Sequence, residues 1–362
     1  MKLLWRLGRE AIRYKGLYVI AILATLALTF VNLAAPRVLS GMTALVAEGV
    51  TREALRQIGL FTLTLCVLYL MRVLFRFLSN YLAHKAAWSL VEDMRIRVYD
   101  KIQSLSMRYF HDKQTGDLMS RVINDTATFE LLYAHIIPES ITNVVTVTGV
   151  MIILLTINVK LALLTCIPIP FILLSGVIFA KKIRPNFREA QQAVAGINAK
   201  IQDNFSGIHE IQSFSQEENE AQAVASRVGV FTKAMLHALK LSSFFHPSVE
   251  FLSAAGTIIV VGFGGLLAFW GEISVSDIVA FLLYLSLFYA PVSGLAKLLE
   301  DMQQAFAGAE RVMAVMDQEQ EIRDEPGAKA AGRLQGAIEF KNVCFAYDEA
   351  VPILKDVSFQ CK

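Results

Sequence analysis

Six long apolar runs dominate the pattern of this 362-residue chain, and charged residues are concentrated between them. A bilayer core of ~30 Å needs about 20 residues of helix, and backbone groups inside it must be satisfied internally. The runs contain no charged residue, except that the second holds Arg72 and Arg76. The predicted membrane-spanning helices are Leu17–Pro36, Ile58–Leu78, Ser140–Val159, Leu161–Ala180, Phe251–Gly271 and Ile278–Ala296. Pro168, Pro170 and Pro291 predict distortion of spans four and six.

The connections between the runs alternate in length and charge. Those after spans two and four are long, roughly 60 and 70 residues, and rich in Lys and Arg, whereas the others are short. Basic residues near the ends of membrane spans favour the cytosolic side. The N-terminus, both long connections and the C-terminus are therefore predicted to face the cytosol.

Each long connection has the periodicity of two helices that meet at a turn. In the first, Leu90, Met94, Val98 and Ile102 recur at helical spacing with charges between them. At 1.5 Å per residue, such helices reach about 40 Å beyond the membrane. Gly116 is expected to break the first connection, and Ser206–Gly207 the second. Taken alone, either turn is compatible with a plain solvated hairpin tip.

The C-terminal pattern differs from everything before it. A charged stretch after Asp317 with Pro326 and several glycines predicts a linker. Residues 338–347 then alternate as a strand with one irregularity, and residues 351–359 offer a second strand. The sequence thus passes from membrane helices to the edge of a water-soluble domain.

Composition narrows the classes further. Hydrophobic residues make up 55% and charged residues 18%, and the net charge of +2 gives no nucleic-acid signal. The four cysteines have no metal-ligand spacing, so neither a zinc site nor a disulfide is expected. The basic, amphipathic start suits a helix lying in the membrane interface or a frayed terminus. The first apolar run lacks a clear cleavage site and is interpreted as a retained span.

Motifs at the two turns resemble the intracellular loops of ABC exporters. "YF" at 109–110, "TGDLMSR" at 115–121 and "ND" at 124–125 resemble the first loop, "SGIHEIQSFSQEENE" the second, and "AERVMAVMD" the end of the sixth helix. The resemblance covers essentially the whole chain. It implies an all-α membrane fold with six spans and long cytosolic extensions, plus a short β-strand tail from an ATPase domain. The implied division is an interfacial elbow helix at 1–16, a transmembrane domain at 17–316, a linker at 317–336 and the start of a nucleotide-binding domain at 337–362.

Carried over residue by residue, the resemblance implies coupling positions and a nucleotide contact. In the family the loop tips receive movement from the ATPase domains, and an aromatic residue at the end of the first strand stacks on adenine; Tyr347 matches that position. Without the resemblance, Tyr347 reads as an ordinary strand-end tyrosine. The implied coupling residues are Thr115, Gly116, Asp117, Leu118, Ser120 and Arg121 in the first loop, with Gly207, Ile208, Glu210, Ile211 and Phe214 in the second.

The catalytic part of an ATPase is not expected within residues 1–362. No phosphate loop of the form G-x-x-x-x-G-K-[S/T] occurs in this sequence, and no counterpart of the family's Mg²⁺ ligand or signature motif was found. ATP and Mg²⁺ are thus cofactors expected of the full-length protein, a hydrolysing translocase, and not of this stretch alone. The sequence is expected to be part of a longer half-transporter or a truncated gene product.

Ionisable residues in and beside the spans indicate a substrate cavity. Arg72 and Arg76 lie four residues apart on one helix face, where they would grip an anionic head group or instead snorkel or pair internally, as Arg76 with Glu250. Tyr284 and Phe288 in span six would line an apolar pocket, although ordinary helix packing explains them equally well. The predicted cavity residues are Arg72, Arg76, Glu250, Tyr284, Phe288 and Lys297.

The resemblance implies an ATP-driven exporter of amphipathic drugs or lipids that works by alternating access. Its partners are a second half-transporter, identical or different, the nucleotide-binding domains and membrane lipids. The location implied is a bacterial plasma membrane, crossed several times. The alternatives are a flippase for lipids or lipid-linked glycans, and a non-hydrolysing channel or regulatory module.

Overall fold

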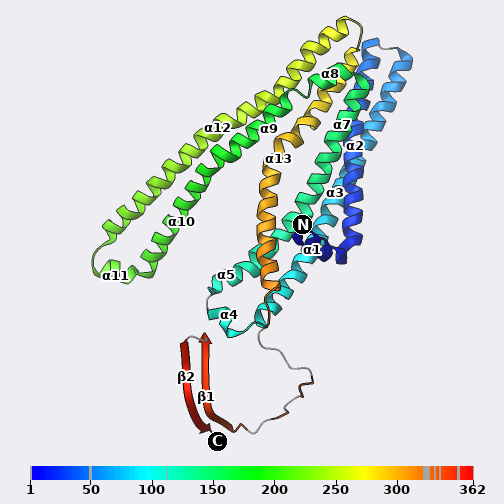
Figure 1. Cartoon of the computed structure of the whole chain (residues 1–362). Coiled ribbons are helices and arrows are strands. Elements are labelled where there is room, and N and C mark those ends of the chain that lie inside the picture. Colours follow the sequence, from blue (N-terminus) through cyan, green and yellow to red (C-terminus); the bar gives the residue numbers. More distant parts are fainter. Residues whose placement is uncertain are drawn as a thin grey trace. The chain divides into compact units, whose positions relative to one another are not determined.

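The computed structural model describes residues 2–48, 51–111, 113–320, 327–329, 332–333, 336–348 and 351–361. Within these residues, six helices are long and apolar enough to cross a membrane. Thirteen α-helices and two strands are described there, and three π-helical stretches and one 3-10 turn join some of them (Figure 1). The α-helices are α1 (Lys2–Ala11), α2 (Lys15–Glu48), α3 (Arg52–Gln103), α4 (Met107–His111), α5 (Thr115–Ser120), α6 (Thr126–Glu130), α7 (Ile137–Ile157), α8 (Val159–Leu164), α9 (Pro168–Ile178), α10 (Arg184–Ser206), α11 (Ile208–Ser213), α12 (Glu217–Phe269) and α13 (Val275–Met316).

The predicted spans coincide largely with these helices, although spans three and five were predicted to end two residues beyond the ends of α7 and α12. Span one was predicted to end at Pro36, but α2 continues through Pro36 to Glu48. Span four is distorted as predicted: α8 ends at Leu164 and α9 begins at Pro168, because a proline ring blocks continuation of the helix before it. Span six is less affected, since α13 runs unbroken through Pro291.

The chain divides into two compact units, and each is described separately. Unit 1 contains Met1–Ala11, Ala87–Glu130 and Gln304–Lys362, and unit 2 contains Ile12–Ala86 and Leu131–Gln303. Unit 2 therefore holds the apolar parts of all the long helices. Unit 1 holds α1, the distal parts of α3 and α13, the first long connection and the two strands.

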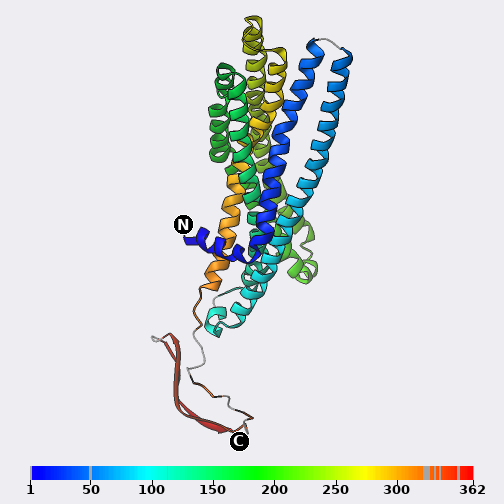
Figure 2. The same ribbon diagram turned by 90° about the vertical axis from the view of Figure 1, so that its right-hand side faces the viewer.

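The core of unit 2 is built from α7, α8, α12 and α13. Leu154, Leu161, Val260 and Phe281 are fully buried there. Helix α2 packs beside α7 (Figures 1 and 2), and a Cβ atom added at Gly149 would lie 2.6 Å from Leu33 Cδ1. A glycine at this position thus allows the two helices to approach closely.

A hydroxyl pair joins α2 and α3 of unit 2. The Oγ atoms of Thr25 and Ser79 lie 2.5 Å apart, and both side chains are buried. Buried hydroxyls cost free energy unless they are hydrogen-bonded, and Thr25 Oγ1 also lies 2.9 Å from the Ala21 carbonyl oxygen. This contact fixes the register of the two antiparallel helices. Residues of α2 that follow Thr25 therefore face residues of α3 that precede Ser79.

Helices α10 and α12 form a hairpin within unit 2. Their shafts run side by side away from α7 (Figure 1), with the short α11 at the tip. Ala190 and Ala238 are fully buried, and the Arg227 guanidinium donates to the Gly196 carbonyl at 2.9 Å. Small buried residues let two helices approach closely, so the predicted pair of helices meeting at Ser206–Gly207 is confirmed.

Unit 1 contains the predicted β tail. Strand β1 (Ile338–Asp348) pairs antiparallel with β2 (Val351–Cys361), and Phe340 stacks on Phe359 with ring centroids 4.5 Å apart. The predicted irregularity is present and larger than expected, because the register shifts at several points and Asn342 has φ of 48°. Local strain of this kind is typical of a bulged strand.

Candidate functional site

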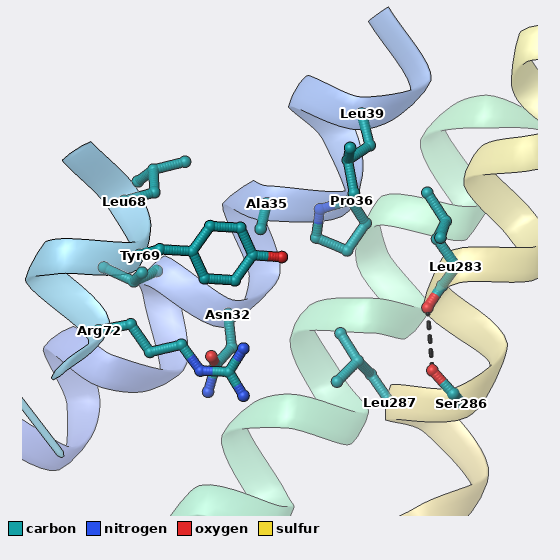
Figure 3. A pocket seen from close by; sticks show the side chains of 11 residues that line it. Asn32, Ala35, Pro36, Leu39, Leu68, Tyr69, Arg72, Leu283, Ser286 and Leu287 are labelled. Atoms are coloured by element: carbon teal, nitrogen blue, oxygen red, sulfur yellow. Dashed lines mark hydrogen bonds between the residues drawn. The ribbon is translucent and has the colours of Figure 1, made fainter. Parts of the chain in front are cut away.

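A small cavity lies among three helices of unit 2 (Figure 3). Its volume is about 210 Å³. Arg72 and Tyr69 reach into it from α3 toward α2, where Asn32 faces them. Apolar side chains of α2 and α13 form the remaining walls. The Ser286 hydroxyl donates a hydrogen bond to the Leu283 carbonyl at 3.1 Å. The lining thus combines an apolar wall with one guanidinium group and a few polar atoms.

Arg72 is the charged member of this cavity. Its guanidinium carbon lies 6.0 Å from the centroid of the Tyr69 ring, in cation–π range. Over the described ranges, no carboxylate forms an ion pair with Arg72. A charge in a membrane helix is costly unless it meets water, a counter-ion or a ligand. The arrangement is therefore suited to an incoming anion.

Asn32 contributes a second polar feature. Its side-chain oxygen is buried and has no hydrogen-bond partner in the described chain. Buried polar atoms are nearly always satisfied, so an exception needs a physical reason. A bound molecule that carries a donor beside its anionic group would supply the missing bond while Arg72 holds the anion.

A larger cavity of about 590 Å³ lies on another side of α2. Its lining is mainly apolar, from α2 and α7, and includes Arg37 and Tyr284. The Tyr284 hydroxyl donates to the Leu33 carbonyl at 2.6 Å. Tyr284 therefore lines this cavity while its hydroxyl is hydrogen-bonded to α2.

The other predicted cavity residues are not gathered with Arg72. Arg76, Glu250 and Lys297 are exposed, and they line neither of the two cavities described above. The ion pair considered between Arg76 and Glu250 does not occur within the described residues. Phe288 is fully buried in the core of unit 2, where it packs beside Tyr289.

The tip of the α10–α12 hairpin exposes apolar side chains. Helix α10 ends at Ser206, Gly207 caps it, and the short α11 follows. Phe205 and Phe214 are 73% and 74% exposed, and Ile208 is 45% exposed. Of the other predicted coupling residues, Glu210 is exposed and Ile211 is half-buried. Exposed aromatic residues at a helical tip mark a contact surface.

The first turn, in unit 1, is organised differently. Thr115, Gly116 and Asp117 open α5, so the break predicted at Gly116 is wrong and lies earlier, around Ser104–Ser106 and Gln114. The Arg121 guanidinium pairs with the Asp117 carboxylate at 2.9 Å, one turn away.

The side chains of α5 face in two directions. Leu118 is buried, whereas Met119 is 63% exposed. Ser120 accepts a hydrogen bond from the Asn124 amide at 3.2 Å. The predicted first coupling segment is therefore a real short helix with one anchored face and one open face.

Two charged contacts fix the surroundings of this turn. Arg311 of α13 donates to both carboxylate oxygens of Asp125, at 2.6 and 2.8 Å, and these bonds hold the pKa of the Arg311 guanidinium above its usual value. Arg6 of α1 likewise donates to Asp317 at 2.6 and 2.7 Å. The bonds from Arg6 lower the pKa of the Asp317 carboxyl. Bidentate pairs of this type combine charge with fixed geometry.

Tyr347, the predicted adenine contact, has its backbone in β1. Its side chain lies outside the described residues. The structure therefore places the strand and leaves the role of this tyrosine a prediction.

Sequence reasoning missed Asn32, Tyr69 and Arg37. Asn32 was visible as a polar residue in an apolar run, which is itself a signal of an interior surface. Tyr69 lies three residues before Arg72, at a spacing that places both on one helix face. The sequence did not show that Asn32 of α2 lies opposite Tyr69 and Arg72 of α3, because that depends on the register between the two helices.

Comparisons with known proteins agree with this architecture. The family model for the ABC transporter transmembrane region matches residues 18–292. An uncharacterised ABC transporter ATP-binding protein of Bacillus subtilis, YknU, is 26% identical over 96% of this chain and 59% of its own length. A fatty acid ABC transporter ATP-binding/permease protein of Mycobacterium bovis is 29% identical over 88% of this chain and 50% of its own.

A third relative broadens the range of named activities. A Staphylococcus aureus ATP-binding/permease protein, provisionally named for multidrug export, is 28% identical over 82% of this chain and 51% of its own length. The chain spans about half the length of the curated relatives it matches.

Proposed function

Because the chain belongs to the ABC transporter transmembrane region family, we propose that it forms the membrane part of an ATP-driven exporter of amphipathic anions. The observation that carries the choice of substrate is the cavity in which Arg72 meets Tyr69 and Asn32. Two relatives are named for fatty acid transport and for multidrug export, and amphipathic cargo is compatible with both names. A fatty acid is an anionic example, whose ionised carboxylate would bind Arg72 but has no donor for Asn32 Oδ1.

The size of the cavity supports recognition of a head group. Sites for whole drug-sized ligands have volumes of about 300–1,000 Å³, whereas this cavity has about 210 Å³. The cavity is therefore large enough for a carboxylate or phosphate group and the atoms attached directly to it. The attached hydrocarbon would lie along the apolar wall that α2 and α13 provide.

The position of Arg72 along α3 is compatible with this cargo. Arg72 lies 14 residues after Ile58, the predicted outer end of span two, which corresponds to about 21 Å of helix. With the predicted orientation, Arg72 then lies in the inner half of span two, on the side from which inner-leaflet amphiphiles enter.

The two helical tips are proposed as docking points for the ATPase domains. The α11 tip exposes Phe205, Ile208 and Phe214, and α5 exposes Met119. Apolar tips that reach about 40 Å from the membrane need a soluble partner to cover them. ATP binding would bias the protein between inward-open and outward-open states, in proportion to its different affinity for each.

The nucleotide chemistry belongs to the proposal as well. ATP and Mg²⁺ would bind in the nucleotide-binding domain that begins with β1, and Tyr347 would stack on adenine. Two half-transporters, identical or different, would assemble, with spans four and five reaching the partner. This matches the separation of the α10–α12 hairpin from α7 (Figure 1).

Flipping of an anionic lipid is the second candidate, favoured by the combination of Arg72 with an apolar wall in one cavity. A channel or regulatory module that never hydrolyses ATP is less well supported, because it gives the exposed tips no partner.

The test uses the protein together with its nucleotide-binding domain, reconstituted in liposomes. Arg72→Ala should reduce ATP-dependent transport of fatty acids or phospholipids about tenfold or more, since a charge-assisted bond contributes roughly 1.5–3 kcal/mol. Arg76→Ala is the matched control, because Arg76 is exposed and lines neither of those cavities. Fatty-acid and phospholipid arms separate export from flipping. Equal transport by both variants and the parent would exclude the Arg72 cavity, and absence of ATP-driven transport altogether would exclude an exporter.

A further inference from the structure

Two histidine side chains of unit 2 meet outside the cavities described above. His84 lies on α3, and His135 lies on the π-helical stretch Leu131–Ile136 that leads into α7. Their ring centroids are 4.9 Å apart and the rings are edge-on, at 86°. Candidate ligand nitrogens of the two rings lie within 4.8 Å of each other. We propose that these two imidazoles form a binding site for a divalent transition-metal ion such as Zn²⁺.

The distance between the rings is compatible with shared coordination. Zinc–imidazole bonds are about 2.0–2.1 Å long, so two nitrogens on one tetrahedral ion are about 3.3 Å apart. The ligand nitrogens lie within 4.8 Å of each other, so side-chain rotation would bring them to that separation. Imidazole nitrogen favours Zn²⁺, Ni²⁺ and Cu²⁺ over Mg²⁺ and Ca²⁺, which prefer oxygen.

A backbone carbonyl prepares one of the rings. His84 Nδ1 lies 2.8 Å from the Asn80 carbonyl oxygen, one helical turn earlier. A carbonyl oxygen only accepts, so Nδ1 carries the proton and the neutral ring presents the lone pair of Nε2. Ligating histidines commonly have this second contact, which fixes ring orientation and tautomer.

The position of the pair makes it reachable. His84 follows the apolar run of α3, and His135 precedes that of α7. His84 is half-buried and His135 is exposed. The site is therefore at the edge of the membrane region, where ions in water reach it.

The local helix geometry at His135 is unusual. A π-helical turn inserts an extra residue relative to an α-helix and is often found at functional sites. An ion held here would join α3 to the segment that leads into α7.

The experiment measures Zn²⁺ binding by titration calorimetry on the whole chain, purified without a histidine tag and freed of metal. One Zn²⁺ per chain is expected. His84→Gln and His135→Gln should each weaken binding at least about tenfold, since even outer contacts of metal sites contribute 10–100-fold. His135→Gln changes an exposed side chain and should leave the fold intact, which circular dichroism checks.

His237→Gln is the control, because His237 is exposed on α12 and belongs to no such pair within the described residues. It should bind Zn²⁺ like the parent. If His84→Gln and His135→Gln also bind like the parent, or if Mg²⁺ competes at equal concentration, the site does not exist.

Discussion

The two helical tips have similar predicted roles but are built in opposite ways. The first, around α5 in unit 1, is held by ion pairs and has Leu118 buried beneath it. The second, α11 in unit 2, ends a hairpin whose aromatic residues Phe205 and Phe214 are about three-quarters exposed. One tip is anchored by its own unit, and the other offers its apolar surface outward.

Because of this difference, substitutions at the two tips should have different effects, one on folding stability and the other on partner binding. Substitutions around the first tip should act mainly on folding, because they break contacts within unit 1. Substitutions at the α11 tip should leave folding unchanged and act on contact with a partner. Each prediction below tests one side of this comparison.

The largest effect is expected at the exposed tip. Changing Phe205 and Phe214 together to Ser should reduce substrate-stimulated ATP hydrolysis of the protein with its nucleotide-binding domain about thirtyfold. Truncating an aromatic anchor at an interface costs ~2 kcal/mol or more. The melting temperature should not change. Val230→Ser, at an exposed position on the α12 shaft, should leave both quantities unchanged; a lowered melting temperature in the Phe variant would show that the tip is structural.

A close helix contact in unit 1 gives the next effect. A Cβ atom at Gly308 of α13 would overlap Thr128 Oγ1 and lie 2.6 Å from Thr128 Cγ2. Gly308→Ala should therefore lower the free energy of unfolding by about 1–3 kcal/mol, the usual cost of overpacking. Thermal unfolding in detergent measures it, and adding Thr128→Ala should restore part of the loss.

The matched substitution in the hairpin has the opposite sign. Nothing lies within 4 Å of a Cβ atom at Gly229 of α12, so Gly229→Ala should stabilise by about 0.5–1 kcal/mol through helix propensity. Equal changes at both glycines would contradict the close packing of α13 against α6.

Breaking the buried anchor should have a moderate effect. Asp125 is 6% exposed and binds Arg311 through both oxygens. Because the Arg311 side chain is half exposed and can regain water, Asp125→Ala should cost about 1–2 kcal/mol, less than a fully buried pair. Lys200→Ala, which removes the Lys200–Glu220 pair of the hairpin, should cost less than Asp125→Ala in the same unfolding assay.

The smallest effect depends on pH. Arg6 lowers the pKa of Asp317 below its ordinary 3.8, so the carboxylate contributes stability above that value and loses it as pH falls through the lowered pKa. Asp317→Asn should therefore reduce the melting temperature slightly at pH 7, and this reduction should shrink progressively as pH falls below 3.8 toward the lowered pKa. The side chains are 38% and 58% exposed, which keeps the contribution under about 1 kcal/mol. A reduction that stays constant as pH falls below 3.8 would assign the effect to packing.

Much of the fold could be predicted because the membrane restricts the choices. Apolar runs such as Phe251–Gly271 have to be helices, and the turn at Ser206–Gly207 has a glycine that caps α10. The break of the first connection was misjudged, because Gly116 fits within the first turn of α5.

The candidate site was harder to predict. Arg72 was recognised from its charge, but its meeting with Asn32 follows from the register that Thr25 and Ser79 set between α2 and α3. Phe288 gives no outward sign of being fully buried, since an aromatic residue in an apolar run suits a core and a cavity equally. Such distinctions depend on side chains far apart in sequence.

Helix α1 is held at two points. Arg6 binds Asp317 of the segment after α13, and Glu10 binds Arg97 of α3 at 2.6 Å. A fluorescent dye attached to α1 will accordingly move with the last turn of the sixth long helix instead of wandering like a loose chain end. A dye on α1 would therefore report directly on movements of the last turn of α13.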